Sequence, residues 1–271
     1  MTKTQTSLKL RYGPWAVVTG ATDGIGRAFA MQLAESGFNL VLAARRGARL
    51  NSIANEITQS HGVQCRAHPV DLSDLAATER LFEATADIDV GLLIAAAGFG
   101  SSGPFLDQDP MAELEMVDVN CSSVLLQCHR FGQRFRARGR GGVVHMSSLL
   151  AFHGTPGSAN YAATKSYIQS LAEALQVEWS AHHIDVIASA PGPVDTGFAK
   201  RANMLLSQST TPEVVARATL AALARNTTVR PGALSKLLGW SLGTAPRFLR
   251  VRIMGNVMAG MTAHQRPARS S

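Results

Sequence analysis

Residues 15–27 read WAVVTGATDGIGR, and this stretch decides the fold. Its first four residues are apolar, as is typical of a short buried strand. Gly20, Gly24 and Gly26 follow at once, and an amphipathic stretch from about 25 to 36 predicts a helix. Such an order of strand, glycine turn and helix places backbone N–H groups and the positive end of the helix dipole together. We therefore expect an anion site at this turn.

The three glycines have separate roles in this interpretation. Gly20 permits the tight turn, Gly24 lets the backbone approach a pyrophosphate, and Gly26 lets the helix pack closely on the sheet. A glycine trio is weak evidence by itself, but its place between a strand and a helix favours a dinucleotide site. We expect cofactor contacts from the turn residues Gly20, Thr22, Asp23, Gly24, Ile25 and Gly26.

Apolar runs alternate with helix-length amphipathic segments along the chain. We expect strands at 15–18, 39–43, 63–70, 90–95, 142–146 and 185–189, and helices at 25–36, 49–60, 76–84, 111–117, 123–136 and 160–180. This alternation predicts an α/β fold: a single-domain doubly wound parallel sheet (Rossmann fold) with helices on both faces and a C-terminal helical extension. No linker or repeat interrupts the pattern, so we predict one domain over 1–271, with 232–271 as its basic, apolar extension.

Composition excludes several classes of protein. Of the 271 residues 46% are hydrophobic and 17% charged, so the chain can bury a core. No apolar run is long enough to span a bilayer, and the first residues lack the apolar stretch of a secretory signal. Cys65, Cys121 and Cys128 have neither CxxC spacing nor histidine-rich surroundings. We therefore expect no disulfide framework, no metal site and a cytoplasmic location.

The net charge of +7 is unevenly distributed. Nine Lys or Arg residues and no Asp or Glu follow Glu213, whereas the chain up to that residue carries a net charge of −2. A nucleic-acid-binding domain would carry its basic face across the body of the domain, so we expect no nucleic acid partner. A local anionic partner for the basic tail stays open.

The end of the second strand discriminates between dinucleotides. An acidic residue there would accept a hydrogen bond from the ribose 2′-hydroxyl of NAD, but this chain has Arg45 and Arg46. A guanidinium suits a 2′-phosphate, so Arg45 predicts NADP(H) as cofactor. The alternative is a solvated surface charge, which fits Arg46 better than Arg45. Asp71, after the third strand, would accept from the adenine amino group or act as an acidic residue at a helix N-terminus.

A second group of residues follows the fifth strand. Tyr161 and Lys165 are four apart at the start of a predicted helix, so their side chains share one face about 6 Å apart along the axis. A nearby ammonium, the helix dipole and a bound nicotinamide would lower the pKa of the phenol. Ser148, thirteen residues before Tyr161, follows the strand end, where α/β sites assemble. The chemistry suggested is hydride transfer, with Tyr161 as acid/base, Lys165 lowering its pKa and holding the ribose, and Ser148 orienting the substrate oxygen.

With these motifs the chain resembles the short-chain dehydrogenase/reductase family. The resemblance rests on three motifs: TGATDGIG at 19–26, Ser148 with YAATK at 161–165, and PGPVDT at 191–196. The resemblance implies a fourth catalytic residue on the helix after strand four, which is Asn120, binding a proton-relay water. It also implies that the nicotinamide carboxamide is held by Pro191, Gly192, Val194 and Thr196.

One segment departs from the family pattern. The family commonly has Asn-Asn-Ala-Gly after the fourth strand, and this chain has Ala95-Ala96-Ala97-Gly98. Ala97 and Gly98 still permit close backbone approach, and we expect them to contact the cofactor. The structural hydrogen bonds of the two amides are lost, so local stability and cofactor affinity are expected to differ.

Both ends of the chain look like the branch that contains very-long-chain 3-oxoacyl-CoA reductases and 17β-hydroxysteroid dehydrogenases. The carriers are YGPWAVV at 12–18, Pro231-Gly232, Pro246 and Met261. The resemblance implies an NADPH-dependent ketone reductase in lipid metabolism, acting on a hydrophobic carbonyl substrate, such as a 3-oxoacyl thioester or a ketosteroid. The eukaryotic members of the branch carry membrane spans; none is expected here.

Apolar residues near the site are candidates for the substrate contacts. We expect a lid over 197–211 with Phe198, Met204 and Leu205, and a wall from Leu149, Leu150 and Phe152, although ordinary core or surface positions explain these residues about as well. His153 is better interpreted as a structural or substrate-loop residue than as a base. His145, on the fifth strand, is better interpreted as a hydrogen-bonded core residue.

A helix is expected after Pro246, with Val251, Met254, Val257, Met258 and Met261 on its apolar side and Arg247, Arg250 and Arg252 nearby. Three interpretations are open for it: packing on a partner subunit of a homo-oligomer, peripheral contact with an anionic membrane, or binding of the phosphates of an acyl thioester. A non-catalytic NADP-binding sensor or scaffold of the same fold is the alternative function. It predicts a damaged catalytic set, whereas Asn120, Ser148, Tyr161 and Lys165 are all present.

Overall fold

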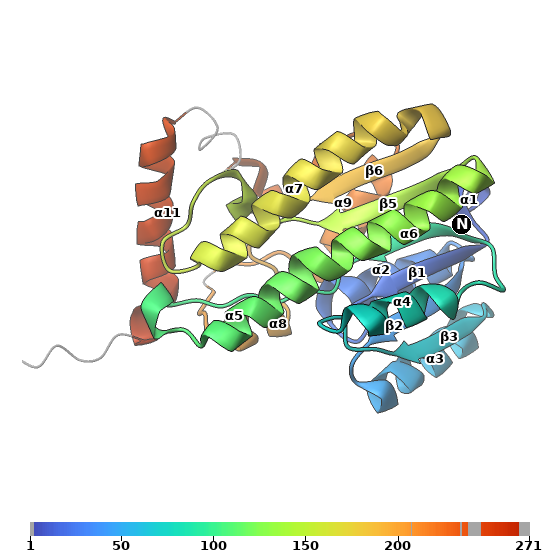
Figure 1. Ribbon diagram of the computed structural model, residues 1–271, viewed down its shortest axis with the longest axis horizontal. Coiled ribbons are helices and arrows are strands. Elements are labelled where there is room, and N and C mark those ends of the chain that lie inside the picture. The colour runs from blue at the N-terminus through green and yellow to red at the C-terminus, as the bar shows by residue number, and fades with distance from the viewer. Residues whose placement is uncertain (1–2, 207, 234, 238–244, 266–271) are drawn as a thin grey trace, which may run out of the picture.

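Seven parallel strands form the centre of the part of the chain that the structure, a computed structural model, describes: residues 3–206, 208–233, 235–237 and 245–265 (Figure 1). Their order is β3-β2-β1-β4-β5-β6-β7, and each neighbouring pair is parallel. The strands are β1 (Trp15–Thr19), β2 (Asn39–Ala44), β3 (Cys65–Pro69), β4 (Val90–Ala95), β5 (Gly141–Met146), β6 (Ile184–Ser189) and β7 (Thr228–Val229). The chain order reverses between β1 and β4, where ligands bind in doubly wound sheets.

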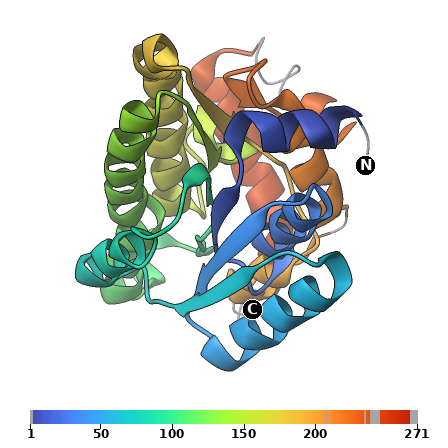
Figure 2. The same cartoon turned by 90° about the vertical axis from the view of Figure 1, so that its right-hand side faces the viewer.

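Helices cover both faces of this sheet, as the sequence predicts (Figure 2). One layer consists of α2 (Gly24–Glu35), α3 (Gly47–His61) and α9 (Pro212–Ala222), and the other of α4 (Leu75–Glu83), α6 (Ser123–Arg138) and α7 (Ala159–Trp179). Strand residues alternate between the two cores. In β1, Val18 packs in the core with Phe29 of α2, whereas Val17 packs in the core with Phe131 of α6. Burial on both faces explains why the strands are apolar without alternation.

All six predicted strands and the predicted helices are confirmed, with one change. The helices expected at 111–117 and 123–136 are α5 (Pro110–Val117) and α6, joined by one turn of π-helix, η2 (Asp118–Ser122). The tail helix is α11 (Arg247–Met261), which begins after Pro246 as expected. Shorter elements are η1 (Phe105–Asp107), η3 (Leu149–Phe152), η4 (Ser180–His182), α8 (Gly197–Arg201) and η5 (Ala263–Gln265). None of the described helices is long and apolar enough to cross a membrane.

The first helix, α1 (Lys3–Tyr12), was not predicted, and a buried polar cluster holds it on the sheet. The hydroxyl of Tyr12, a fully buried residue, donates to Asp185 Oδ2 at 2.6 Å. Arg11 donates to the same carboxylate through Nε at 2.8 Å and Nη2 at 3.1 Å. Asp185 lies near the start of β6, so this cluster joins α1 to a central strand.

Replacing Asp185 by Ala tests the cluster. The change leaves the buried Tyr12 hydroxyl without its acceptor and removes an ion pair, so the free energy of unfolding should fall by about 2–3 kcal/mol. Urea denaturation measures this. Asp107→Ala, at an exposed carboxylate, is the control. Equal effects of the two substitutions would show that the cluster contributes nothing specific.

Candidate functional site

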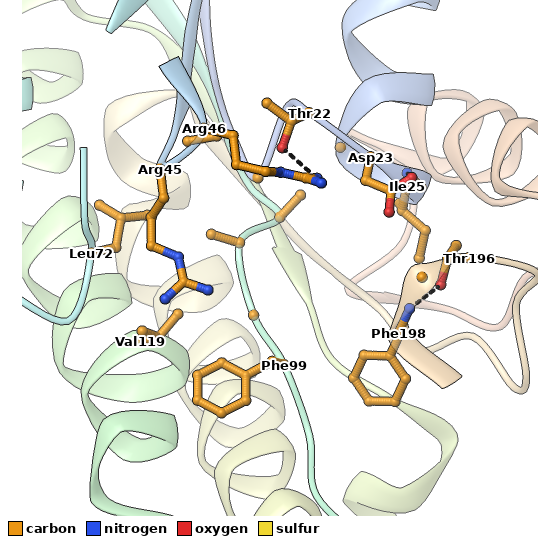
Figure 3. Close-up of a pocket in the computed structure, with 18 of the residues that line it drawn as sticks. Thr22, Asp23, Ile25, Arg45, Arg46, Leu72, Phe99, Val119, Thr196 and Phe198 are labelled. Carbon is orange, nitrogen blue, oxygen red and sulfur yellow. Dashed lines mark hydrogen bonds between the residues drawn. The ribbon is translucent and has the colours of Figure 1, made fainter. Parts of the chain in front are cut away.

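A cavity of about 560 Å³ opens at the carboxyl ends of the strands, beside the reversal between β1 and β4 (Figure 3). It is lined by residues that are far apart in the sequence. Those among the predicted cofactor contacts are Gly20, Thr22, Asp23, Gly24, Ile25, Gly26, Arg45, Asp71, Ala97, Gly98 and Thr196. The predicted Tyr161, Lys165, Pro191, Gly192 and Val194 do not line this cavity, and they lie on the elements that follow β5 and β6.

The glycine turn leaves no room for side chains at two positions. Gly20 has a φ of +69°, and a β-carbon there would lie 2.9 Å from Cα of Ala97. A β-carbon on Gly26 would collide with the carbonyl oxygen of Gly20. The side chain of Asp23 caps α2 by accepting from the Gly24 N–H at 2.9 Å. The turn is therefore a bare backbone surface at the start of a twelve-residue helix, which suits a pyrophosphate.

Thr19 supports the segment that departs from the family pattern. Its hydroxyl oxygen accepts from the N–H groups of Ala96 at 3.1 Å and Ala97 at 3.2 Å. It lies 3.4 Å from the carbonyl oxygen of Ile94, to which it donates. The hydroxyl at the end of β1 thus fixes the backbone of this alanine segment without the two amide side chains.

The two arginines after β2 point in different directions, as Figure 3 shows. Arg46 Nη2 donates to Thr22 Oγ1 at 3.1 Å, so this side chain lies against the glycine turn. Arg45 points away from the turn and donates to Glu115 at 3.2 Å. Arg201 of α8 lies 3.6 Å from the same carboxylate. Arg46 is exposed, as a solvated surface charge would be, and it also lines the cavity and contacts the turn.

Asp71 lines the cavity beside Arg45. Its Oδ1 accepts from the N–H and the hydroxyl of Ser73, at 3.1 and 2.9 Å. Burial alone would raise the pKa of Asp71, but these hydrogen bonds, together with the charges of Arg45 and Arg201, lower it. The cap of the following helix is Asp74 and not Asp71, because Asp74 accepts from the Ala76 N–H at 2.8 Å.

The four predicted catalytic residues converge near Gly98, a residue of the cavity wall. A β-carbon on Gly98 would lie 2.9 Å from Asn120 Oδ1 and 3.3 Å from Lys165 Nζ. Lys165 Nζ lies 5.6 Å from the centroid of the Tyr161 ring. Ser148 caps η3, with its hydroxyl oxygen 3.2 Å from the Leu150 N–H, and it is hydrogen-bonded to Tyr161. Asn120 and Lys165 thus meet at Gly98, and Tyr161 and Ser148 follow next to Lys165.

Asn120 is fixed by the widened turn η2. Its Oδ1 accepts from the Phe99 N–H at 3.1 Å, and its Nδ2 donates to the Phe99 carbonyl at 2.9 Å. Nδ2 also lies 3.1 Å from Thr164 Oγ1, one residue before Lys165. The amide thereby joins the segment after β4 to α7. π-Helical turns inside α-helices frequently mark functional positions.

The pKa values of Tyr161 and Lys165 are shifted in a way that the sequence did not predict. Burial raises the pKa of Tyr161 to about 12, and the hydrogen bond with Ser148 acts against this. Burial lowers the pKa of Lys165 to about 8, and its ammonium donates to the Met146 carbonyl at 2.9 Å. The expectation of a lowered pKa for Tyr161 is therefore wrong for the protein groups alone, because burial outweighs the hydrogen bond with Ser148.

Phe198 of the expected lid lies over Tyr161, with their ring centroids 5.2 Å apart. Gly100 borders both rings, since a β-carbon there would lie 2.7 Å from Phe198 and 2.9 Å from Tyr161. Leu205, also expected in the lid, is 64% exposed, and its N–H donates to the Met261 carbonyl at 3.0 Å. The lid is thus in contact with the proposed proton donor at one end and with α11 at the other.

The Pro-Gly segment after β6 lies beside the serine segment. The Pro191 carbonyl accepts from the Leu149 N–H at 2.9 Å, and the Gly192 N–H donates to Ser235 at 2.7 Å. Val194 pairs with Thr210 in a short parallel bridge. Thr196 caps α8, and its methyl group would lie 2.7 Å from a β-carbon on Gly24. This segment therefore joins the glycine turn to the residues around Tyr161.

Sequence analysis did not identify Arg201 and Phe99. The Arg201 guanidinium lies 3.6 Å from the centroid of the Phe99 ring, and both residues line the cavity. Neither residue has a spacing or a motif that would mark it. Only the fold brings α8 against the segment after β4.

Comparison with known proteins points to one family. The model of the short chain dehydrogenase family matches residues 14–205. The 7beta-hydroxysteroid dehydrogenase of Collinsella aerofaciens is 33% identical over 180 residues, which are 66% of this chain and 68% of that protein. The very-long-chain 3-oxoacyl-CoA reductase of Laccaria bicolor is 36% identical over 178 residues, which are 64% of this chain and 53% of that protein.

Solved structures show the same likeness. One described in a study of 7beta-hydroxysteroid dehydrogenase stereoselectivity superposes with a TM-score of 0.84 at 28% identity, covering 92% of this chain and 99% of that one. A short-chain dehydrogenase from Sphingobium yanoikuyae, in complex with NADPH, has a TM-score of 0.78 at 26% identity, covering 96% and 98%. Family match, sheet order and site agree: this chain belongs to the short-chain dehydrogenase/reductase family of oxidoreductases.

Proposed function

We propose that this protein is an NADP(H)-dependent oxidoreductase that interconverts a ketone and a secondary alcohol on a hydrophobic substrate, with Tyr161 as the acid/base. The observation that carries the proposal is the meeting of two groups of residues at Gly98. Asn120 and Lys165 border this glycine on one side, with Tyr161 and Ser148 next to Lys165, and Gly98 lines the cavity above the glycine turn on the other.

The cavity fits a dinucleotide. Side chains are excluded at Gly20 and Gly26, where a pyrophosphate would lie against the backbone. Arg46, held against Thr22 at the turn, and Arg45 supply two guanidinium groups where a 2′-phosphate is expected. The solved relative from Sphingobium yanoikuyae was determined with NADPH, which supports the choice of NADP(H). Asp71 would accept a hydrogen bond from the adenine amino group.

A bound nicotinamide supplies or accepts the hydride. Ser148 would orient the substrate oxygen next to Tyr161, which would donate a proton to it during reduction and take one back during oxidation. A buried tyrosine whose pKa is raised is protonated at neutral pH and is ready to donate in the direction of reduction. Lys165 would stabilise the phenolate that remains, and Asn120 would hold a water of the proton relay.

A hydrophobic substrate is supported by the surroundings of Tyr161. Phe198 covers its ring, and Phe99, Met116 and Val119 form a small apolar cluster against it. The names of two relatives refer to a hydroxysteroid and to a very-long-chain oxoacyl-CoA. We infer a substrate of comparable hydrophobic character.

The alternative of a non-catalytic sensor receives no support, since the four catalytic side chains are present and lie together. Four expectations stay predictions: one domain over 1–271 with 232–271 as its extension, a cytoplasmic location, peripheral membrane contact and a homo-oligomer.

Tyr161→Phe tests the acid/base role. It removes the hydroxyl and keeps the ring, so ketone-dependent NADPH oxidation should fall by about 10²–10⁴-fold or more while NADPH binding, followed by fluorescence, is kept. Tyr167→Phe, on the same helix but 40% exposed, should leave the rate unchanged. Full activity of Tyr161→Phe would exclude the mechanism.

Arg46→Gln and Arg45→Gln test the cofactor choice. Each should raise the KM for NADPH about tenfold or more, because one charge-assisted hydrogen bond to a phosphate is lost, and change the KM for NADH little. Arg27→Gln, which removes an exposed ion pair with Glu56, is the control. The 2′-phosphate role is refuted if both cofactors weaken equally.

The pH dependence reports on Lys165. Because burial lowers its pKa to about 8, the ammonium is present below that pH and lost above it, so kcat/KM for NADPH should decrease above pH 8. Tyr161, with a pKa of about 12, contributes no decrease in this range. A guanidinium stays charged, so Lys165→Arg, if active, should extend the plateau to higher pH. A profile flat to pH 10 in the wild type would contradict the assignment.

A further inference from the structure

Helix α11 lies along the segment that connects Ser148 with Tyr161 (Figure 1). A β-carbon on Gly154 would lie 3.8 Å from Val251, and one on Gly157 would lie 3.9 Å from Met258. Between them, a β-carbon on Gly255 would lie 3.2 Å from Pro156. The helix thus covers residues 154–157 for about two turns. The helix therefore packs on the loop between the two predicted catalytic residues Ser148 and Tyr161.

The basic residues of α11 lie on two different faces. Met254 and Met258 are 5% and 2% exposed and define the inner face of the helix. Arg247 precedes Met254 by seven residues, or about two turns, so it lies on the same side of the helix as the two methionines, whereas Arg252 lies on the opposite side. The side chain of Arg247 is exposed at the first residue of α11, where a ligand can reach it from solvent.

Buried polar groups without partners lie next to these charges. His153 is 3% exposed, and neither ring nitrogen has a hydrogen-bond partner within the described part of the chain. Burial, followed by the charges of Arg250 and Arg247, lowers the pKa of His153, which favours the neutral ring. Arg247 lies one turn before Val251, the residue that contacts Gly154, so it is on the part of α11 next to His153. Such unpaired groups are costly and call for a partner.

Arg230, directly after β7, adds a further cation beside Phe152, the residue before His153. Its guanidinium lies 4.5 Å from the centroid of the Phe152 ring, and its Nε is buried with no acceptor among the described residues. No Asp or Glu follows Glu213, so neither this strand end nor α11 supplies a counter-charge. Two cations and a buried neutral imidazole match an oxyanion, which accepts hydrogen bonds from all three.

We propose that His153, Arg230 and Arg247 form a subsite for an oxyanion, a carboxylate or a phosphate, carried by the substrate at its end remote from the ketone. The inference rests on the proposed function, because it assigns the ketone to Ser148 and Tyr161. From Ser148 to His153 the chain advances five residues, mostly as a 3₁₀-helix, or about 10 Å. The substrate class is therefore a long hydrophobic ketone with an acidic group about that far from the carbonyl.

The experiment compares three probes with the NADPH-loaded protein: a series of long-chain keto acids of increasing ketone–carboxylate separation, their methyl esters, and a 3-oxoacyl-CoA. The wild type should show a KM at least tenfold lower for the best acid than for its ester. Arg247→Gln should raise the KM for the acid about tenfold, with kcat and the ester unchanged. Arg252→Gln, the same change on the opposite face, should alter neither.

His153→Leu and Arg230→Gln give independent readings of the same subsite, and each should reduce the preference for the acid. A selective effect on 3-oxoacyl-CoA alone would assign the site to phosphate. Equal KM values for acid and ester in the wild type, with no effect of Arg247→Gln on the thioester, would overturn the proposal. So would equal effects of Arg247→Gln and Arg252→Gln.

Calorimetric titration of acid and ester separates this inference from the proposed function. If no ketone is reduced, the proposed function fails, and the difference in binding between acid and ester, with its loss in Arg247→Gln, still decides the subsite. The opposite outcome is reduction of ketones without any difference in affinity between acid and ester, in the wild type and in Arg247→Gln alike. If the affinity for the thioester is also the same in both proteins, the subsite fails and the proposed function stands.

Discussion

The contact between the turn after β1 and the segment after β4 is the constraint on which the site depends. Gly20 approaches the backbone of Ala97 so closely that even a methyl group is excluded, and Thr19 hydrogen-bonds the same segment. This contact sets the position of Gly98, which faces the cavity on one side and Asn120 and Lys165 on the other. The backbone itself therefore brings cofactor turn and catalytic residues together.

Burial controls the chemistry of the tyrosine and the lysine. It moves the pKa of Tyr161 up and that of Lys165 down, so each group favours its neutral form. A neutral phenol can donate a proton, but the phenolate it leaves behind needs positive charge nearby. Lys165 supplies this charge only while it stays protonated, and its position 5.6 Å from the Tyr161 ring makes the two ionisations interdependent.

The sequence predicted the sheet and its helices because apolar strands and amphipathic helices are local patterns. It did not predict α1 or β7. The α1 sequence, KTQTSLKLRY, has no apolar periodicity, and the helix is held by the Tyr12–Asp185 contact across more than half the chain. With two residues, β7 is too short to give a pattern, and only pairing with β6 defines it.

Site residues divide in the same way. The glycine turn and the Ser148, Tyr161 and Lys165 set have fixed spacings that the sequence displays. Asn120 came only from the family resemblance, and Arg201 was missed, because each acts across a fold contact that no local pattern records. The contact of Arg46 with the glycine turn was not expected for the same reason: Thr22, to which it donates, lies twenty-four residues earlier in the chain.

The strand–turn–helix unit, the alternation of strands and helices, and the candidate proton-transfer residues can all be recognised in the sequence, since each depends on neighbours within a few turns. Which charges of a helix lie on the side of the core follows from tertiary packing alone. Arg247 and Arg252 are equivalent in the sequence, yet Arg247 lies on the side of α11 that carries the buried Met254 and Met258, and Arg252 lies on the opposite side. The physical reason is that the orientation of a helix is set by what its apolar side buries, here Met254 and Met258 against the segment after Ser148.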